Sequence, residues 1–381
     1  MNTKYDFYAN FQIEKKNDVD DLINGAGKYD EIKDTLTRIM LLSTIFGVKD
    51  ERFPDKMGRH NRIDPIVYAR IGEDNASGLK ALIHSKGNYN DYVTCKLSEF
   101  SCLGIDATID LSALPKGSWG IEFPITLAKP FISRDDVPFY VIDSLVRKDK
   151  VFGVPFTSAT TWKGNLRWTM MKIQLEPSVK DPEKFAEIRF RHTLLFGTEK
   201  GREDTPTGWA KYLNELCRDA QVLYQKKLKE KFEKKEAPNL RGMLHPYSTF
   251  WDKIDMEVIN PHDRKSKTGK TPIYFETVPK GSRGVFRIIY VPLHWIMLSD
   301  EELEKRTLRD LRDVVIGLKA MMLVYGFSAK KSTGYGVIKD EWDKDASKLM
   351  IKDFVKDSLK FSNFEELTQK VSRINERLNN E

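Results

Sequence analysis

A strand, a helix and a glycine-closed loop follow one another in the last third of the chain, and this succession constrains the fold most. Residues 284–292 are strongly β-prone, and Ser299 with Glu302 forms a capping box that should start a helix. Apolar residues then recur at helical spacing until Gly326, where we expect the helix to end. Residues 337–338 should begin a further strand. This order is what the second half of a β-α-β-β-α-β unit contains.

The loop between that helix and the last strand is basic and rich in glycine. It reads Ser-Ala-Lys-Lys-Ser-Thr-Gly-Tyr-Gly over residues 328–336. Gly334 and Gly336 permit backbone conformations and close approaches that a side chain blocks. The two lysines supply positive charge, and Tyr335 supplies a ring on which a base could stack. Many loops contain lysine and glycine, so the loop alone is a weak signal.

A second stretch, residues 143–168, places hydroxyl and basic side chains at a helix start. We expect Thr160 or Thr161 to cap this helix, with Lys163 and Arg167 in its first turns. Free backbone N–H groups beside two basic side chains can bind phosphate oxygens. An ordinary capped surface helix with solvated bases explains the same stretch equally well.

Together the two stretches resemble the RAMP superfamily, the ferredoxin-like RNA-binding proteins of CRISPR systems. The superfamily's loop ends Gly-aromatic-Gly, as residues 334–336 do, but residues 328–329 are Ser-Ala where two glycines are usual. Its Lys-Gly-x-Leu-Arg helix start is matched by residues 163–167. The usual Pro-Gly-Ser-Ser lead-in is here Phe-Thr-Ser-Ala-Thr-Thr-Trp.

Within the superfamily the chain is most similar to the backbone subunits of type III effector complexes. Those subunits carry an Ile-Asp-Asn/Ser-Pro-Val loop, which residues 142–146 follow with Leu145 in place of proline. The resemblance implies an α+β fold with a ferredoxin-like (RRM-like) core, a large helical and β insertion and an added N-terminal region. It implies that the chain holds guide RNA (crRNA) by its backbone, meets target RNA and assembles with other CRISPR effector subunits. The implied RNA-binding residues are Lys163, Gly164, Asn165, Arg167, Lys330, Lys331, Ser332, Thr333, Gly334, Tyr335 and Gly336.

The resemblance also gives Asp143 a possible catalytic role. In active members the matching aspartate lies beside the guide–target duplex, where a ribose 2′-hydroxyl attacks the adjacent phosphate in a metal-dependent reaction. Asp143 would then be a metal ligand, for Mg²⁺ or another divalent cation, or would help to deprotonate the hydroxyl. Asp135 and Asp136 are second-choice carboxylates, and the superfamily's glycine-rich turn near them is here a proline and a charged cluster, residues 128–136. A turn residue that bonds its own backbone, or an aspartate retained without use, is the alternative.

Histidines offer a different chemistry within residues 239–279. His245, and His262 followed by Arg264, could line RNA, and a histidine pair would fit a metal-independent, guide-processing ribonuclease. Hydrogen-bonded loop structure explains these residues as well. The Thr-Gly-Lys-Thr at 268–271 lacks the spacing and context of a phosphate loop, which argues against nucleotide hydrolysis.

The resemblance to the RAMP superfamily implies a division of the chain into four parts. We expect an N-terminal accessory region at 1–114, the RAMP core at 115–172 and 283–345, an insertion at 173–282 and a C-terminal helical tail at 346–381. Further expected elements are strands at 5–13, 119–127 and 187–196, two strands within 92–111, helices at 30–46 and 209–236, and two short helices within 353–379.

The composition is that of a globular protein, and its net positive charge is compatible with a polyanionic partner. Hydrophobic residues make up 40% and charged residues 31% of 381 residues, and the formal net charge is +7. The three cysteines show no Cys-x-x-Cys spacing, which argues against a disulfide framework or a cysteine zinc site. No signal peptide or membrane-length apolar run is evident, so we expect a cytoplasmic protein. A basic scaffold without an RNA role would share this composition.

Overall fold

The computed structural model describes residues 7–47, 64–72, 77–84, 89–106, 108–137, 140–142, 144–199, 207–232, 239–262 and 272–379. The chain divides into two compact units. Unit 1 comprises Met1–Ala107, Pro130–Phe156 and Phe250–Ser282, and unit 2 comprises Thr108–Lys129, Thr157–Thr249 and Arg283–Glu381. The domain ranges expected from the sequence stay a prediction beside this contact-based division.

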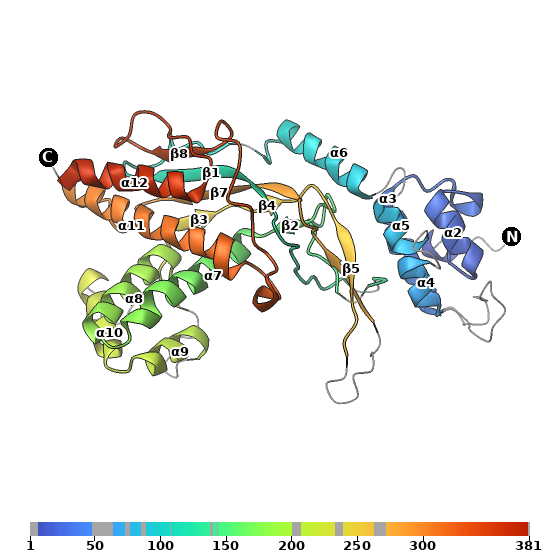
Figure 1. Ribbon diagram of the computed structural model, residues 1–381, viewed down its shortest axis with the longest axis horizontal. Helices are drawn as coiled ribbons and strands as arrows, with labels where there is room; N and C mark the ends of the chain where they lie inside the picture. Colours follow the sequence, from blue (N-terminus) through green and yellow to red (C-terminus); the bar gives the residue numbers. More distant parts are fainter. Residues whose placement is uncertain are drawn as a thin grey trace. The chain divides into compact units, whose positions relative to one another are not determined.

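Unit 2 is built on a four-stranded sheet (Figure 1). Its strands are β1 (Trp119–Thr126), β3 (Leu244–Pro246), β7 (Arg283–Tyr290) and β8 (Lys348–Ile351). The order across the sheet is β3-β7-β1-β8, and all neighbours are antiparallel. The predicted strands at 119–127 and 284–292 are confirmed as β1 and β7. The chain therefore forms a mixed α and β fold with an antiparallel sheet.

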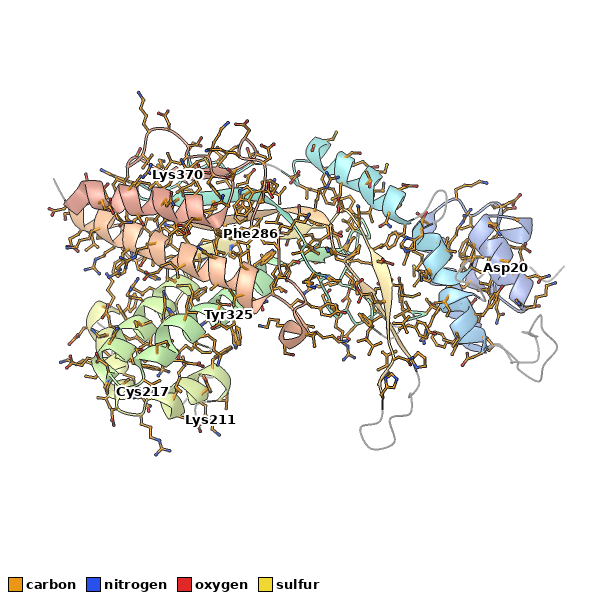
Figure 2. All side chains as sticks on the ribbon, in the orientation of Figure 1. Asp20, Lys211, Cys217, Phe286, Tyr325 and Lys370 are labelled. Atoms are coloured by element: carbon orange, nitrogen blue, oxygen red, sulfur yellow. The ribbon has the colours of Figure 1, made fainter. Side chains whose placement is uncertain are left out.

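One face of this sheet carries the aromatic core of unit 2. Trp119 stacks on Tyr290 with ring centroids 5.0 Å apart, and Phe123 lies 5.5 Å from Phe286, which Figure 2 labels. Such pairs come from directly opposed residues of β1 and β7, because side chains on one face repeat every second residue. On the other face Glu122 pairs with Arg287 at 3.3 Å.

Unit 2 also contains helices, and those within residues 182–232 pack around an apolar cluster of their own. The helices of the unit are α7 (Ala159–Met170), α8 (Pro182–Phe196), α9 (Gly208–Leu216), α10 (Ala220–Phe232), α11 (Asp300–Ala320) and α12 (Phe364–Asn379), and α7 and α11 each continue as one π-helical turn, Met171–Leu175 and Met321–Tyr325. The predicted cap of α11 is confirmed, because Ser299 Oγ accepts from the Glu302 N–H. Gly326, with φ 71°, ends the run as expected. Figure 1 shows α11 and α12 side by side, and Lys319 and Glu365 join them at 3.0 Å.

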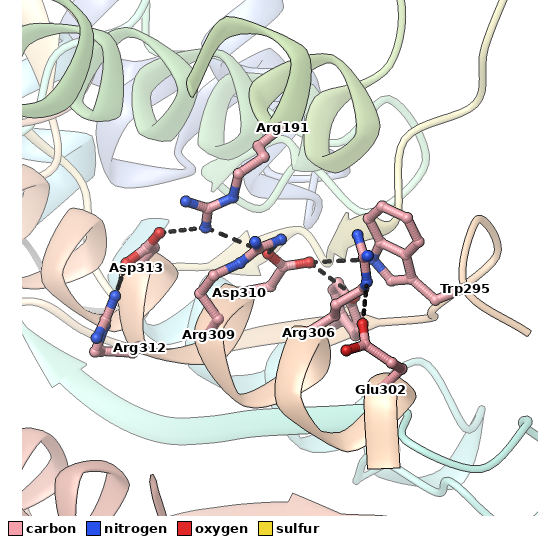
Figure 3. Close-up of polar contacts among 9 residues, drawn as sticks. Arg191, Trp295, Glu302, Arg306, Arg309, Asp310, Arg312 and Asp313 are labelled. Atoms are coloured by element: carbon pink, nitrogen blue, oxygen red, sulfur yellow. Dashed lines mark hydrogen bonds and ion pairs between the residues drawn. The ribbon is translucent and has the colours of Figure 1, made fainter. Parts of the chain in front are cut away.

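A buried polar network ties α8 to α11 (Figure 3). Arg191 of α8 donates to Asp310 at 3.4 Å and to Asp313, both on α11. Asp310 also accepts hydrogen bonds from Tyr290 at 2.9 Å and from Trp295 at 3.4 Å. Because a buried carboxylate is costly unless it is paired, this network fixes the position of α8 against α11.

Unit 1 contains short helices around their own apolar core and a two-stranded sheet. The helices are α1 (Phe7–Asn10), α2 (Lys16–Asn24), α3 (Thr35–Leu42), α4 (Pro65–Ile71), α5 (Gly78–His84) and α6 (Tyr89–Cys102), and the strands are β5 (Asp255–Ile259) and β6 (Ile273–Thr277). The helix expected at 30–46 is present but begins later, because Asp34 caps α3 by accepting from the Thr37 N–H at 2.7 Å. Two-residue strands β2 (Phe156–Thr157) and β4 (Thr249–Phe250) pair with each other.

Three predicted strand regions are wrong, because helical spacing was mistaken for alternation. Within 5–13, α1 brings the Phe7 and Phe11 rings to 4.9 Å, a contact of residues one helical turn apart. The strands expected within 92–111 are replaced by α6 up to Cys102, where Val93 and Phe100 are buried two turns apart. The strand expected at 187–196 is helix α8, which starts at Pro182 after the Asp181 cap.

Two helix predictions need correction. The helix expected at 209–236 is interrupted at Cys217, which leaves the helical region with φ −143° and ψ 88°, so α9 and α10 are separate; residues 233–236 lie outside the described part. The tail contains one helix, α12, where two were expected within 353–379. Within the part of the chain that the structure describes, every helix is too short or too polar to cross a lipid bilayer.

Candidate nucleic-acid interface

Helix α7 starts earlier than predicted. The expected cap at Thr160 or Thr161 is wrong, because Ser158 is the cap: its Oγ accepts from the Thr161 N–H at 3.2 Å. The hydroxyls of Thr160 and Thr161 lie 3.0 and 2.9 Å from the same oxygen. Ser158 stays extended, with φ −68° and ψ 153°, while both threonines are already helical. The three hydroxyls together fix the first turn of the helix.

One side of α7 is anchored in the core of unit 2. Trp162 is buried, donates from Nε1 to Thr249 Oγ1 at 3.0 Å and packs edge-on against Phe286. Leu166, four residues on, is buried as well. Gly164 lies on the opposite, exposed side, and a Cβ built there meets no atom within 4 Å. The exposed side of α7 at Gly164, called the crest below, is therefore backbone that no side chain covers.

Polar and aromatic side chains flank this crest on two sides. An α-helix turns about 100° per residue, so Lys163 and Arg167 lie on one flank of Gly164, and Asn165 and Trp168 lie on the other. The matched Lys-Gly-x-Leu-Arg motif therefore does not form one cluster. It presents two flanks separated by a glycine.

The first flank belongs to a basic cluster formed by Lys163, Arg167, Arg241 and His245. Burial lowers the pKa of Lys163, and Arg167 and Arg241 lower it further. Burial, Lys163 and Arg241 lower the pKa of His245 to about 4. Among the described residues, no carboxylate forms an ion pair with Lys163, Arg167 or Arg241. Arg167 and Arg241 repel Lys163, and an anion would relieve this repulsion, although Glu199 already attracts Arg167.

Arg241 was not among the residues that the sequence pointed to. It reaches the cluster because two glycine backbones meet: a Cβ on Gly242 would come within 2.4 Å of the Phe196 carbonyl carbon, and Gly197 pairs with Arg241. The only signal in the sequence was the Arg-Gly pair itself. Nothing in it showed that this glycine lies against the end of α8.

The glycine-rich loop holds an unusual backbone. Ser328 and Lys330 have φ of 74° and 54°, and Gly334 and Gly336 have φ of 85° and 71°. A Cβ on Gly336 would come within 2.1 Å of the Phe327 carbonyl oxygen, so glycine is required where the loop closes. Ser328 stands where the superfamily usually has glycine, and its positive φ explains why glycine is usual there.

Lys331 of the loop contacts the second flank of α7. Lys331 Nζ donates to Asn165 Oδ1 at 3.2 Å and lies 3.9 Å from the centroid of the Trp168 ring. Burial lowers the pKa of Lys331. Asn165 in turn donates to the Thr161 carbonyl oxygen at 2.8 Å, which orients its amide. The structure thus brings together Lys331 and Asn165, two residues predicted from separate motifs.

The other predicted loop residues surround this contact. Lys330, Ser332 and Thr333 are exposed, whereas Gly334 and Tyr335 are half-buried and Gly336 is buried. Thr333 Oγ1 donates to the Lys330 carbonyl oxygen at 2.8 Å, which closes the turn. The tip of the loop therefore exposes one lysine and two hydroxyl side chains.

The predicted carboxylates belong to unit 1. Asp143 lies outside the described residues. Asp135 donates its N–H to the Leu145 carbonyl oxygen at 3.3 Å, and its carboxylate accepts from Lys150 at 2.7 Å. Burial alone would raise the pKa of Asp135, but Lys150 lowers it below the usual value. Asp136 is 95% exposed and lies 3.8 Å from Arg134.

A buried network holds the chain on the C-terminal side of Asp143. Glu276, which is fully buried, pairs with Lys148 at 2.8 Å and accepts from the Tyr140 hydroxyl at 2.5 Å and from the Val146 N–H at 3.1 Å. Ser144 pairs with Phe275 of β6. The sequence did not point to Glu276 or Lys148, because their positions are 128 residues apart.

The remaining predicted residues are distributed over both units. His262 is exposed in unit 1, His245 belongs to unit 2, and Arg264 lies outside the described residues. Over the described ranges, no three histidine, cysteine, aspartate or glutamate side chains are grouped as metal ligands would be. The described neighbours of Asp143 therefore do not by themselves make a divalent-cation site.

Comparison with known proteins decides the family. The family model of the RAMP superfamily matches residues 137–339, more than half of the chain. This chain belongs to the RAMP superfamily. The matched range contains both α7 and the glycine-rich loop of this RAMP protein. A solved structure described as "Cryo-EM structure of the Type III-B Cmr-beta bound to cognate target RNA" is similar at 14% identity and a TM-score of 0.40, covering 88% of this chain and 99% of that one. Comparison with curated proteins gave no match.

Proposed function

We propose that this RAMP protein is a crRNA-binding subunit of a type III CRISPR effector complex and serves antiviral defence. It holds guide RNA by its backbone on α7 and the glycine-rich loop. The observation that carries the proposal is the contact of Lys331 with Asn165, because it joins two motifs of the superfamily on one surface. Other effector subunits and target RNA are the expected partners.

A ferredoxin-like core is part of this proposal. In chain order unit 2 runs β1, α7, β3, β7, α11 and β8, which is a β-α-β-β-α-β succession. The sheet order β3-β7-β1-β8 places the first and third of these strands in the centre. The elements between α7 and β3, and the whole of unit 1, are then additions to that core.

The shape of α7 suggests the path of the RNA backbone. A strand that crosses the open crest at Gly164 meets the basic cluster on one flank and Lys331 with Asn165 on the other. Phosphate and sugar are the chemical groups that Lys163, Arg167 and Lys331 can bind without reading sequence. A subunit that must accept any guide needs such sequence-independent contacts.

Cleavage of paired target RNA by Asp143 remains a second part of the proposal. A carboxylate near a splayed nucleotide can accept the proton of the 2′-hydroxyl that attacks the neighbouring phosphate. A bound divalent cation would supply charge stabilisation for that reaction. The buried Glu276–Lys148 pair would hold Val146, and so would fix the chain just after Asp143. Asp135, already paired with Lys150, is a weaker candidate.

A subunit that binds guide RNA but does not cut is the alternative within this fold. A metal-independent histidine ribonuclease is another, and His245 is its better candidate, since a pKa of about 4 leaves it unprotonated and able to accept a proton at neutral pH. A base alone does not supply the acid that such a mechanism also needs.

Cleavage of labelled target RNA by the assembled, guide-loaded complex tests the enzymatic part. We expect Asp143→Ala to abolish one specific cut while target binding is retained, and chelator to abolish the same cut in the wild-type complex. Asp357→Ala is the matched control and should cut normally, because Asp357 is an exposed carboxylate of unit 2 that has no part in the proposal. An unchanged pattern with Asp143→Ala leaves only the structural role, and cutting in chelator that His245→Gln removes selects the histidine mechanism.

A further inference from the structure

An aromatic pocket lies next to the loop-contacting flank of α7, in unit 2. Its volume is about 430 Å³, and it opens broadly to solvent. Trp168, Met171 and Lys172 line it from α7 and the π-turn that follows. Gly208, Trp209 and Tyr212 line it from the first turns of α9. The residues that line this pocket all lie outside the family motifs identified in the sequence.

The aromatic walls of the pocket are held in place by polar contacts. The Tyr212 hydroxyl donates to Glu176 Oε1 at 2.8 Å, and Lys172 donates to the same oxygen. The hydrogen bond to Glu176, followed by burial, raises the pKa of Tyr212, so its hydroxyl stays a donor. Trp209 and Tyr212 meet edge to face, with ring centroids 6.2 Å apart. A ligand would find these rings already oriented.

The remaining wall links the pocket to the proposed RNA surface. The ring of Trp168 carries Lys331 of the glycine-rich loop at 3.9 Å and meets the edge of Tyr325, labelled in Figure 2, at 5.5 Å. Lys172 lies 5.6 Å from the same ring. Two ammonium groups, of Lys331 and Lys172, and four aromatic side chains, of Trp168, Trp209, Tyr212 and Tyr325, therefore gather within one part of the molecule. Aromatic rings beside cations are the arrangement that binds single-stranded RNA, because each base has a face to stack and each phosphate has a charge.

We propose that this pocket receives one unpaired nucleobase of the RNA strand held on α7. The inference rests on the proposed RNA-binding function and adds the site at which one base leaves the path of the backbone. Stacking accepts all four bases, so the pocket is compatible with a guide of variable sequence. The base would lie against Trp209 and Tyr212, while Lys331 and the α7 crest hold the adjoining phosphates.

Fluorescence of 2-aminopurine, placed at successive positions of a single-stranded RNA, tests the pocket directly. We expect quenching at one position in the register when the full chain binds, because a stacked 2-aminopurine loses fluorescence. Tyr212→Ala should abolish that quenching and weaken binding roughly 5- to 150-fold, the range expected for losing one stacked base. Trp209→Ala should act in the same way.

The matched control is Tyr212→Phe, which keeps the ring and removes only the hydroxyl bond to Glu176. It should quench and bind like the wild-type protein. Tyr212 is 39% exposed, so its truncation should leave the fold intact, which thermal unfolding checks. Quenching that persists in Tyr212→Ala and Trp209→Ala, or is absent at every position while wild-type protein binds RNA, overturns the pocket but leaves the proposed function standing.

Two further outcomes separate this inference from its alternatives. Wild-type protein that binds no RNA, alone or in the assembled complex, overturns the proposed function and the pocket together. Variants that bind RNA normally but fail to assemble with other subunits would show that the pocket binds a protein side chain. That result would overturn the proposal that it binds a nucleobase.

Discussion

The ammonium group of Lys331 lies 3.9 Å above the ring centroid of Trp168. The two residues come from the glycine-rich loop and from helix α7, and the same ammonium donates to Asn165 at 3.2 Å. A loop whose backbone adopts strained conformations is thereby attached to a helix anchored in the core. This contact sets where the cations of the loop lie relative to the open crest of α7.

Removal of this ammonium should cost stability as well as charge. We expect Lys331→Ala to lower the free energy of unfolding by about 1 kcal/mol, because a partly buried cation–π contact and a hydrogen bond are lost. Urea denaturation measures the change. Lys339→Ala, which removes an exposed lysine of the same unit, is the control and should be neutral. Equal stability of the two variants would show that the Lys331 contact does not hold the loop.

Substitutions at Gly164 should distinguish an effect on stability from an effect on RNA binding. A Cβ at this position meets nothing within 4 Å, so Gly164→Ala should raise the free energy of unfolding by about 0.5–1 kcal/mol through helix propensity. Gly164→Leu should fold as well yet weaken RNA binding at least about tenfold, because its side chain would stand on the crest that the RNA backbone crosses. Thermal unfolding and RNA titration of both variants measure the two effects.

Gly317 of α11 is the matched control for that comparison. A Cβ there would come within 2.6 Å of Met170 Cγ, so Gly317→Ala should destabilise the fold where Gly164→Ala stabilises it. RNA binding unaffected by Gly164→Leu would place the RNA elsewhere.

Ser328 should tolerate glycine better than its neighbour does. Its φ of 74° is costly for a residue with a Cβ, whereas Ala329 has no positive φ. We expect Ser328→Gly to be neutral or stabilising and Ala329→Gly to lose about 0.5–1 kcal/mol, as glycine does when it only adds disorder to the unfolded chain. Chemical denaturation of the pair checks this, and a Ser328→Gly variant less stable than Ala329→Gly would contradict the strain argument.

His192 should make the fold sensitive to acid. Burial, Arg167 and Arg191 lower its pKa to about 3, from 6.5 in the unfolded chain. Below pH 6.5 the unfolded chain therefore binds a proton that the folded chain does not, so stability falls as the pH falls toward 3. This residue alone should remove about 2 kcal/mol between pH 7 and pH 5.

Denaturant unfolding at the two pH values, in wild-type protein and in His192→Gln, isolates this contribution. His192 Nε2 donates to Gln174 Oε1 at 2.8 Å, a contact that an amide N–H can replace. The variant should lose about 2 kcal/mol less than the wild-type protein over the same pH range. An identical loss in both proteins would mean that His192 does not carry the acid sensitivity.

Elements whose local sequence pattern matches the structure that they adopt could be predicted from the sequence. Strand β7 and the Ser299 cap of α11 were predictable because β-branched residues and a capping box act within a few positions. Helices α6 and α8 were missed because apolar residues at helical spacing also satisfy a partial alternation. Local patterns decide such cases only when caps such as Asp181 are given more weight than alternation.

The candidate site was predictable in its parts and not in its assembly. Lys163, Arg167 and Lys331 follow from motifs, but their division between two flanks of α7 depends on Trp162, which buries the opposite side. Arg241 joins the basic cluster through a long-range glycine contact that no local pattern reports. Such contacts depend on packing between segments distant in sequence, which periodicity does not describe.

The salt dependence of RNA affinity tests the central claim most directly. We predict that wild-type protein binds single-stranded RNAs of unrelated sequence with similar affinity, and that log K falls linearly with log salt concentration. Lys163→Ala, Arg167→Ala and Lys331→Ala should each weaken binding to every sequence and lower the slope by about one, while Lys339→Ala should change neither. Slopes and affinities that are the same in all four variants and the wild-type protein would contradict an RNA-binding surface on α7 and the glycine-rich loop.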